Sequence, residues 1–508
     1  MANDVVKIIT QPYWLKVFML VVVLSSAYAG YPLVSDLKAE YLSTDLLIYL
    51  LVCGFIVFVS YIRKQPHLSE PWLQVFKNKI AMSSAVVLFF FVVVGLMDSI
   101  HFRQADASND KSASSRAEIT YSTDLMSLLD VSLDYISRDS EKTYSAPFSI
   151  YSYAKENITN EEGIKQRVYP RLKFAGSHLD SKQDYLSDVM YKSIIGILIG
   201  LFITLVLIIF VLLLLKRSYA DSYLDTLGKL VRGEFKLPWN VMLVTSGVII
   251  LFCSWLFYMS IYYHVMGTDK VGQDVFYLTL KSIRTGLVIG TLTTLIMLPF
   301  AIALGVMAGF YKGLVDDIIQ YIYTTLNSIP GILLIVAVML AIDVYIENHA
   351  EFFETAIERA DIKLLALCAV LGITSWTGLC RLLRGEVFKL GELEYIQAAR
   401  ALGVSNFKII TSHIIPNVMH IVLIVVVLDF SGLVLAEAVL AYIGVGVDPS
   451  IISWGNMINS ALFELAREPI VWWSLISAFS FMFALVLAAN LFSDAIRDAF
   501  DPRMQGIK

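Results

Sequence analysis

Long apolar runs separated by shorter polar stretches fill most of this chain. Each run is about 20 residues long, which is the length that crosses a bilayer as a helix. The runs lie near residues 17–35, 44–62, 80–98, 191–215, 241–263, 283–310, 320–344, 363–383, 418–445 and 471–493. This pattern predicts an all-α polytopic membrane protein with about ten transmembrane helices. The composition agrees, because a hydrophobic content of 57% exceeds that of most soluble domains.

The first apolar run has two interpretations. Lys7 and Lys16 precede it, and Ala27-Tyr28-Ala29 resembles a signal-peptidase site. The apolar character continues to Val34, which makes the run long enough to span the membrane and favours an uncleaved anchor. Cleavage is the alternative, and it would leave the topology of the remaining chain unchanged.

Lysine and arginine are concentrated in three of the polar stretches. These clusters lie within Arg63–Lys79, Lys216–Lys236 and Arg381–Lys408. If the spans simply alternate, all three clusters lie on one side, and their positive charge marks that side as cytoplasmic. Both termini are then cytoplasmic, and the long polar segment 99–190 lies outside. Its apolar pattern between Leu125 and Ile136 predicts a helix within a small extracytoplasmic domain.

The polar stretch Gly391–Asn417 has internal order. Apolar residues recur at helical spacing just before it and within it, at Phe388, Leu390, Leu393, Ile396, Ala399 and Leu402. This spacing predicts an amphipathic helix that ends at Gly403. Ser405 would cap a second short helix, and Pro416 would open the next apolar run. We expect this element at the membrane surface, with an apolar ridge for a partner's groove; a hairpin that only links two spans is the alternative.

The same stretch resembles the cytoplasmic coupling loop of ABC importer permeases, and most of all their di- and oligopeptide branch. The resemblance rests on Gln397-Ala398-Ala399, Gly403 and the closing His413-Ile414-Ile415-Pro416-Asn417. It implies that the loop docks into an ATPase subunit through Gln397, Ala398, Ala399, Gly403, Ile415 and Pro416. Gln397 stands where the family usually carries a glutamate.

Three further motifs resemble the same family. Met266–Val275 resembles the Leu-Gly-Thr-Asp-x-x-Gly-Arg-Asp signature of peptide-type importers, with Gln273 in place of the arginine. Glu437–Val447 together with Ser453–Met457 is similar to the family's outer loop between its last two spans. The ending Arg497–Arg503 matches the family's ending.

The resemblance covers about residues 260–503 and implies an ABC type I importer permease fold for the last six helices. The predicted domains follow from it. They are three N-terminal transmembrane helices (1–98), the extracytoplasmic domain (99–190), a fourth transmembrane helix with a cytoplasmic linker (191–240), and the permease domain (241–508) with its coupling loop at 391–417.

Two acidic residues lie within one apolar run. Asp429 and Glu437 are eight positions apart, so they fall on roughly the same side of a helix. Because an acid in hydrocarbon costs about 2.5–3.5 kcal/mol on insertion scales, both should face the bundle or a water-filled path. Helix–helix hydrogen bonding is the alternative. Thr268, Asp269 and Trp454 complete the candidates for the path or gate, although the Thr268-Asp269 pair also suits a plain turn.

Small residues and a proline predict local packing. Ala301, Gly305 and Gly309 form a small-residue stripe at four-residue spacing, which is typical of close helix packing. Pro330-Gly331 predicts a break or kink in a helix. The four cysteines all fall within apolar runs, so we expect them to pack as small apolar residues.

These features predict a transmembrane permease subunit of an ATP-driven ABC importer for peptides, in the bacterial inner (plasma) membrane. The resemblance implies a second homologous permease, ABC ATPase subunits and an extracytoplasmic substrate-binding protein as partners, with membrane lipid around the spans. We expect no enzymatic activity, because no G-x-x-x-x-G-K-[ST] phosphate loop occurs and ATP–Mg would bind to the ATPase partner. We expect no cofactor, metal or catalytic residue, and the net charge of −5 gives no indication of a nucleic-acid partner.

Three alternatives are compatible with the sequence. A secondary transporter driven by an ion gradient would use Asp429 and Glu437 as ion sites. A membrane sensor would bind a ligand through the outer domain, although no signalling domain follows on the cytoplasmic side. An ABC permease for nickel chelates or antimicrobial peptides would carry similar motifs.

Overall fold

The structure is a computed structural model that describes residues 37–64, 66–105, 121–159, 165–179, 182–219, 223–349, 351 and 355–500. The predicted run at 17–35 and the question of its cleavage lie outside these residues. Contacts divide the chain into two compact units. The first unit contains the residues up to Tyr41, Gly54–Arg284 and Ser460–Phe492, and the second contains Leu42–Cys53, Thr285–Asn459 and the residues from Ser493. The predicted domain boundaries stay a prediction.

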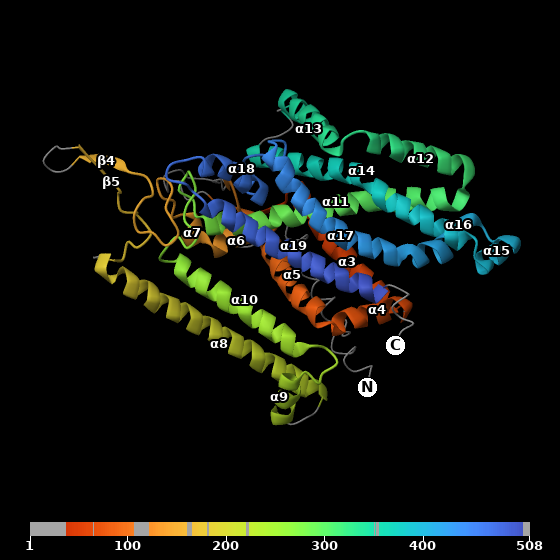
Figure 1. Ribbon diagram of the computed structural model, residues 1–508, viewed down its shortest axis with the longest axis horizontal. Helices are drawn as coiled ribbons and strands as arrows, with labels where there is room; N and C mark the ends of the chain where they lie inside the picture. The colour runs from red at the N-terminus through yellow and green to blue at the C-terminus, as the bar shows by residue number, and fades with distance from the viewer. Residues whose placement is uncertain are drawn as a thin grey trace, which may run out of the picture. The chain divides into compact units, whose positions relative to one another are not determined.

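Within the described ranges, five helices of ten or more residues lie wholly within the first unit, which also contains parts of α3 (Ser43–Lys64), α11 (Val275–Tyr311), α18 (Trp454–Leu465) and α19 (Trp473–Phe500). These five are α4 (Pro66–Lys77), α5 (Lys79–Asp98), α8 (Tyr185–Tyr219), α9 (Tyr223–Arg232) and α10 (Trp239–Ser260). Helices α8 and α10 lie side by side along their length (Figure 1). Two glycines of α8 allow this approach, since a Cβ at Gly200 would lie 3.0 Å from the Leu251 backbone and one at Gly196 would lie 3.2 Å from that of Trp255.

The segment of the first unit that is predicted to lie outside, called the outer domain below, is built from short elements. Strands β1 (Leu37–Glu40), β2 (His101–Ala105) and β3 (Tyr121–Ser127) form an antiparallel sheet in that order, while β4 (Glu156–Thr159) and β5 (Lys165–Val168) form a hairpin. Helices α6 (Leu128–Ser132) and α7 (Asp134–Ser137) and the 3₁₀ turn η1 (Lys182–Asp184) complete it. The predicted helix start at Leu125 was wrong. A capping box between Ser127 and Asp130 starts the helix three residues later and leaves Leu125 in β3.

The second unit is a bundle of longer helices. It contains the first part of α3 (Ser43–Lys64), most of α11 (Val275–Tyr311), α12 (Gly313–Ser328), α13 (Gly331–Asn348), α14 (Ala356–Gly391), α15 (Glu394–Ala401), α16 (Asn406–Ile409), the π turn η3 (Ile410–Ile414), α17 (Ile415–Tyr442), and parts of α18 (Trp454–Leu465) and α19 (Trp473–Phe500). Buried Thr44 at the start of α3 donates its N–H (3.1 Å) and its hydroxyl to the Asp361 carboxylate of α14.

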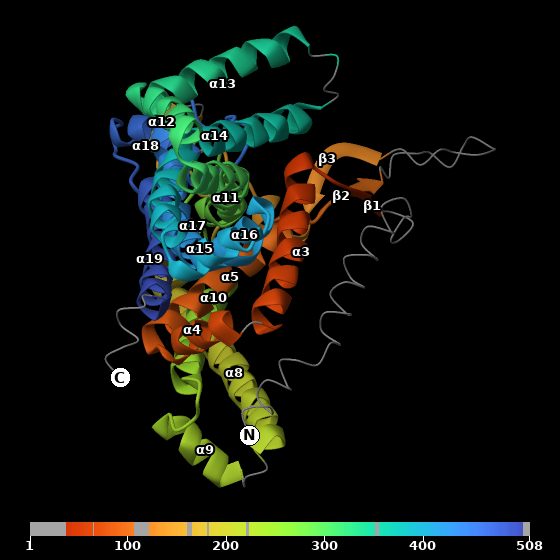
Figure 2. The ribbon, with the colours of Figure 1, turned by 90° about the vertical axis from the view of Figure 1, so that its right-hand side faces the viewer.

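Among the described residues, eight helices are long and apolar enough to cross a membrane, and α3 carries a shorter apolar stretch. A helix occupies each predicted run from 44–62 onward, so the all-α polytopic class is confirmed. The prediction of a single uninterrupted span over 320–344 was wrong, because two separate helices, α12 and α13, cover this run. Pro330 has no N–H to donate, and α12 ends before it while α13 begins after it, turning back to pack along α14 (Figure 2).

The predicted small-residue stripe of α11 is confirmed as a helix contact. Ala301 is fully buried, and a Cβ at Gly305 would lie 2.8 Å from the Cys380 carbonyl oxygen of α14. A Cβ at Gly309 would lie 2.7 Å from the carbonyl oxygen of Arg384. The two backbones therefore approach so closely that no larger residue fits between them.

We expect Gly305→Val to push α11 away from α14. Overpacking of this kind costs about 1–3 kcal/mol, which should lower the unfolding temperature of the subunit in detergent. Gly385→Val on α14 is the matched control, because a Cβ there meets nothing within 4 Å. Equal unfolding temperatures for the two variants would contradict the packing role of the stripe.

Candidate functional site

The candidate coupling element begins after α14 and is organised around a glycine corner. Helix α15 ends near Leu402, and Gly403 follows with φ of +75°. The Gly403 N–H donates to the carbonyl of Arg400 (3.0 Å), and the Val404 N–H donates to that of Ala399 (3.1 Å). This left-handed residue satisfies the last carbonyls of the helix, as glycine commonly does. The predicted glycine stop is confirmed. The predicted amphipathic helix is shorter than expected, because Phe388 and Leu390 belong to the end of α14 and α15 begins only at Glu394.

The second half of the element differs from the prediction. Helix α16 passes through the π turn η3 directly into α17, so 406–442 form one continuous helix instead of a short helix followed by a span. Ser405 occupies the cap position, but its side chain bonds no helix N–H. Pro416 does lie in the first turn of α17. A wider turn just before proline accommodates its missing donor without ending the helix.

The apolar residues of the element divide between two surfaces. Ile396, Ile409 and Ile414 are fully buried in a common core. By contrast, Leu402 is 83% exposed and Phe407 is 76% exposed. The prediction that the whole apolar ridge faces outward was therefore wrong in part. Ile396, at the centre of the ridge, faces inward and holds the element to its own unit. The free apolar surface is the tip formed by Leu402 and Phe407, with Leu393 and Tyr395 also exposed.

The predicted site residues of this element lie in one region but differ in access. Gln397, Ala398 and Gly403 are exposed, whereas Ala399 packs against the core. Ile415 and Pro416 are half-buried at the start of α17. The Gln397 side chain donates to the carbonyl of Glu392 (3.3 Å), so its amide bonds within the element in the place of the usual carboxylate.

Two ion pairs that sequence analysis missed hold this part of the unit in place. Lys312 lies 2.5 Å from Glu392, which joins the corner between α11 and α12 to the start of the element. Arg384 of α14 donates twice to Asp316 of α12, at 2.5 and 2.6 Å. The guanidinium of Arg400 also lies over the ring of Phe310, 4.5 Å from its centre. The partners are distant in sequence, and only their opposite charges could have indicated the pairing.

The outer motif of the second unit forms a tightly packed loop. Glu437 is 2% exposed, and a Cβ at Gly455 would lie 2.4 Å from its Oε1. Trp454 is buried against Gly286 of α11, where a Cβ would lie 3.0 Å from its ring. Asp429, two turns away on α17, is half-buried. The structure thus packs Glu437 against the Gly455 backbone and Trp454 against α11, and the role of these residues in a path or gate stays a prediction.

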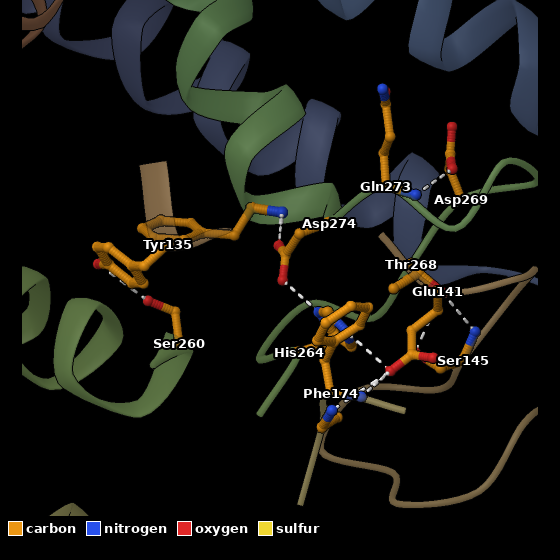
Figure 3. A network of polar contacts seen from close by, with 12 residues as sticks. Tyr135, Glu141, Ser145, Phe174, Ser260, His264, Thr268, Asp269, Gln273 and Asp274 are labelled. Atoms are coloured by element: carbon orange, nitrogen blue, oxygen red, sulfur yellow. Dashed lines mark hydrogen bonds and ion pairs between the residues drawn. The ribbon is translucent and has the colours of Figure 1, made fainter. Parts of the chain in front are cut away.

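The signature loop of the first unit, residues 266–275, is fixed by a network of hydrogen bonds (Figure 3). The buried Thr268 hydroxyl accepts from the Ser145 N–H (2.6 Å) and donates to the carbonyl of Thr143 (2.9 Å). Asp269 accepts from the N–H groups of Val271 and Gln273, both at 2.9 Å. The predicted turn at Thr268-Asp269 is therefore confirmed, and it is joined to the outer domain.

A buried charge cluster lies beside this loop (Figure 3). His264 contacts Asp274 at 2.7 Å through Nδ1 and Glu141 at 3.7 Å through Nε2. Burial alone would lower the pKa of His264, but the two carboxylates outweigh it and raise the pKa to about 9. Burial would likewise raise the pKa of Glu141, yet His264 and the N–H groups of Lys173, Phe174 and Ala175 lower it to about 2. The imidazolium is thus held between two carboxylates.

A second ionic contact attaches the outer domain to α11. Lys281 lies 2.6 Å from both carboxylate oxygens of Asp130, and the Tyr277 hydroxyl donates to the same residue (2.7 Å). Tyr153 donates to the carbonyl of Ile470 at 3.0 Å. Among the described residues, no group of three or more histidine, cysteine or acidic side chains is placed to hold a metal ion.

Comparison with known proteins agrees with this architecture of apolar helices. Residues 301–506 match the family of binding-protein-dependent transport system inner membrane components. The chain is 31% identical over 242 residues to a dipeptide transport system permease protein DppC of Alkalihalophilus pseudofirmus, a match that covers 48% of this chain and 73% of that protein. A glutathione transport system permease protein GsiD of Pectobacterium atrosepticum (30% identical, the same shares) and an oligopeptide transport system permease protein OppC of Bacillus subtilis (28%, 48% and 72%) are also similar.

The chain therefore belongs to the family of binding-protein-dependent transport system inner membrane components. It is a multi-pass protein of the inner membrane, and the resemblance to ABC importer permeases is confirmed.

We expect the cluster around His264 to be most stable in mildly acidic solution. The contribution of His264, about 3 kcal/mol for a shift of this size, is fully present below about pH 6.5 and is lost as the pH rises through about 9. The contribution of Glu141 to stability is present above about pH 4.5 and is lost as the pH falls towards 2. Hydrogen exchange of the Phe174 and Ala175 amides, corrected for the intrinsic pH dependence, should show maximal protection between these limits.

The variant His264→Gln should remove the alkaline limb of this profile. His413→Gln, in the coupling element, serves as the control and should keep it. An alkaline loss of protection that persists unchanged in His264→Gln would assign it to another group.

Proposed function

We propose that this chain is a permease subunit of an ATP-driven ABC importer for peptides. Three similar proteins are named as dipeptide, oligopeptide and glutathione transport permeases, and the four sequence motifs support the same substrate class. The single observation that carries the proposal is the coupling element, an exposed apolar tip on a firmly held helix corner. A tip of this kind fits a hydrophobic groove in a partner.

In this proposal the coupling element transmits the state of the ATPase to the permease. The ATPase subunits bind ATP–Mg and close, and their groove moves the tip formed by Leu402 and Phe407. One ion pair, Lys312–Glu392, joins the α11–α12 corner to the start of the element, and a second, Arg384–Asp316, joins α14 to α12. The movement therefore shifts these helices together. This change opens the path, formed with a second homologous permease, to one side of the membrane or the other. Asp429 and Glu437 are the acidic candidates along α17.

The outer domain has a supporting role in the same proposal. It holds the signature loop and contributes to the surface that meets an extracytoplasmic substrate-binding protein, without lining the path. Its contacts through Asp130, Glu141 and Ser145 all reach segments that flank the spans. Deleting the domain would leave the buried charges of Lys281 and His264 without these partners, so point variants test this role better than a deletion.

We expect Gly403→Val to uncouple transport from ATP hydrolysis. A β-branched residue at φ of +75° is strained by about 1–3 kcal/mol, although nothing lies within 4 Å of its Cβ. The strain should re-aim the corner while all spans stay in place. Peptide uptake in cells should fall, and ATP hydrolysis in proteoliposomes with the complete importer should lose its response to peptide.

Gly403→Asn is the matched control, because asparagine tolerates positive φ better than other residues with a side chain. Ala398→Asp is an independent probe, since it places an unpaired charge on the exposed face of α15 beside the tip. Membrane levels of each variant are measured by immunoblot. Unchanged uptake for both Gly403→Val and Ala398→Asp would show that residues 391–417 only link two helices.

We also expect cytoplasmic termini and an outer position for residues 99–190. Lys142 and Lys389 have similarly exposed side chains, each paired with a glutamate. Lys142→Cys and Lys389→Cys are placed singly in a background whose four native cysteines are replaced by alanine. An impermeant maleimide added to intact cells with a permeabilised outer membrane should label only Lys142→Cys. Labelling of Lys389→Cys alone would reverse the topology.

A further inference from the structure

The first unit contains an apolar cavity that neither the coupling element nor the signature loop explains. It has a volume of about 480 Å³, within the range of ligand sites. Its walls come from α5, α10, the start of α11 and α19, and also from Pro147, Val265 and Met266. The helix residues include Phe91, Phe252, Cys253, Trp473 and Ala484. Phe252 is half exposed, so the cavity opens towards the surroundings of the helices.

The depth of the cavity corresponds to one leaflet of a bilayer. The deepest wall residues, Val87 on α5, Ile249 on α10 and Ala484 on α19, each lie 11 positions from the helix end nearest the outer domain. At 1.5 Å per residue this is roughly 17 Å, close to half of a hydrocarbon core about 30 Å thick. A partner's transmembrane helix would need a groove along the full thickness, whereas one acyl chain needs only this half.

The chemistry of the walls also selects an acyl chain. None of the lining residues is charged, and the hydroxyl of Ser480 donates to the carbonyl of Ile476 in its own helix (2.6 Å). Such walls offer nothing to an ion or to the termini of a peptide. Trp472, half exposed at the outer end, suits the headgroup region that tryptophan prefers.

Met266 of the signature loop lines the cavity, and a second wall residue, Trp473, bonds to that loop. The Trp473 indole N–H donates to the carbonyl of Thr268 (2.9 Å), and a Cβ at Gly267 would lie 2.9 Å from the same ring. The ring also packs edge-on against Tyr153 of the outer domain, with 4.9 Å between centroids. The Trp473 side chain is 1% exposed, so it forms a closed part of the cavity wall that an occupant would meet directly.

We propose that the cavity binds one acyl chain of an outer-leaflet phospholipid, and that this chain packs along the wall that contains Trp473. The proposal depends on the chain spanning the inner membrane with residues 99–190 outside, as proposed above, and is independent of which substrate is transported. The lipid would then be a structural ligand that fills the cavity between α5, α10, α11 and α19.

The test uses the purified full-length subunit in nanodiscs of phosphatidylcholine with one dibrominated acyl chain, because bromine quenches a tryptophan that the chain touches. The Trp473 signal is the difference between the unmodified protein and Trp473→Phe. We expect this signal to be lost in brominated lipid. Ala484→Phe, which fills the cavity, should preserve it, whereas Leu487→Phe, on an exposed position of α19 outside the cavity, should not.

A second measurement is independent of the Trp473 variant. Native mass spectrometry of the detergent-purified protein should show one retained phospholipid for the unmodified chain and for Leu487→Phe, and its loss for Ala484→Phe. Equal quenching and equal lipid retention in the two variants would overturn the proposal. So would cross-linking of Cys253 to a cysteine on a second permease subunit, since that helix would then cover the cavity.

Discussion

Inside the hydrocarbon core of a bilayer, a backbone N–H or C=O without an internal partner costs several kcal/mol. This constraint decides the form of most of the chain. Apolar runs become long helices such as α8, α11 and α17 because only a helix satisfies its own backbone. Irregular backbone is found where other groups complete it. At the corner after α15, Gly403 and Val404 donate to the last carbonyls of the helix, and at the signature loop Thr268 and Asp269 supply side-chain partners.

Buried charges obey the same constraint more strictly, since an unpaired charge costs more than an unpaired peptide group. Glu141, His264 and Asp274 therefore occur together, as do Asp130 and Lys281. In both clusters one member belongs to the outer domain and another to a segment that flanks a span. The outer domain is thus not an independent appendage of the first unit. Removing His264 would leave Glu141 and Asp274 without their shared cation, and removing Lys281 would leave Asp130 without its counter-charge.

The sequence predicted well those features that depend on local pattern. Helical spacing and the glycine stop located α15 and its corner, and the stripe of Ala301, Gly305 and Gly309 correctly indicated close packing. Features that depend on distant residues could not be predicted. Ile396 belongs to an apolar ridge in sequence, but only the positions of Ile409 and Ile414 show that it faces inward. The pairing of Lys312 with Glu392, 80 positions apart, had no local signal.

The exposed tip of the coupling element lowers the stability of the free subunit, whereas the fixed backbone beneath it raises that stability. Together, these two features favour docking to a partner. Leu402 and Phe407 are exposed to water in the free subunit. Burial of each side chain by a partner would contribute about 1.5–3 kcal/mol to binding. The ordering cost of binding is small in return, because the buried isoleucines and the pairs at Glu392 and Arg384 already fix the backbone beneath the tip. The same fixation lets a displacement of the tip reach α11 and α14, since a loosely attached loop would absorb the movement. In the proposed coupling, the ion pairs at the base of the element therefore matter as much as the apolar side chains at its end.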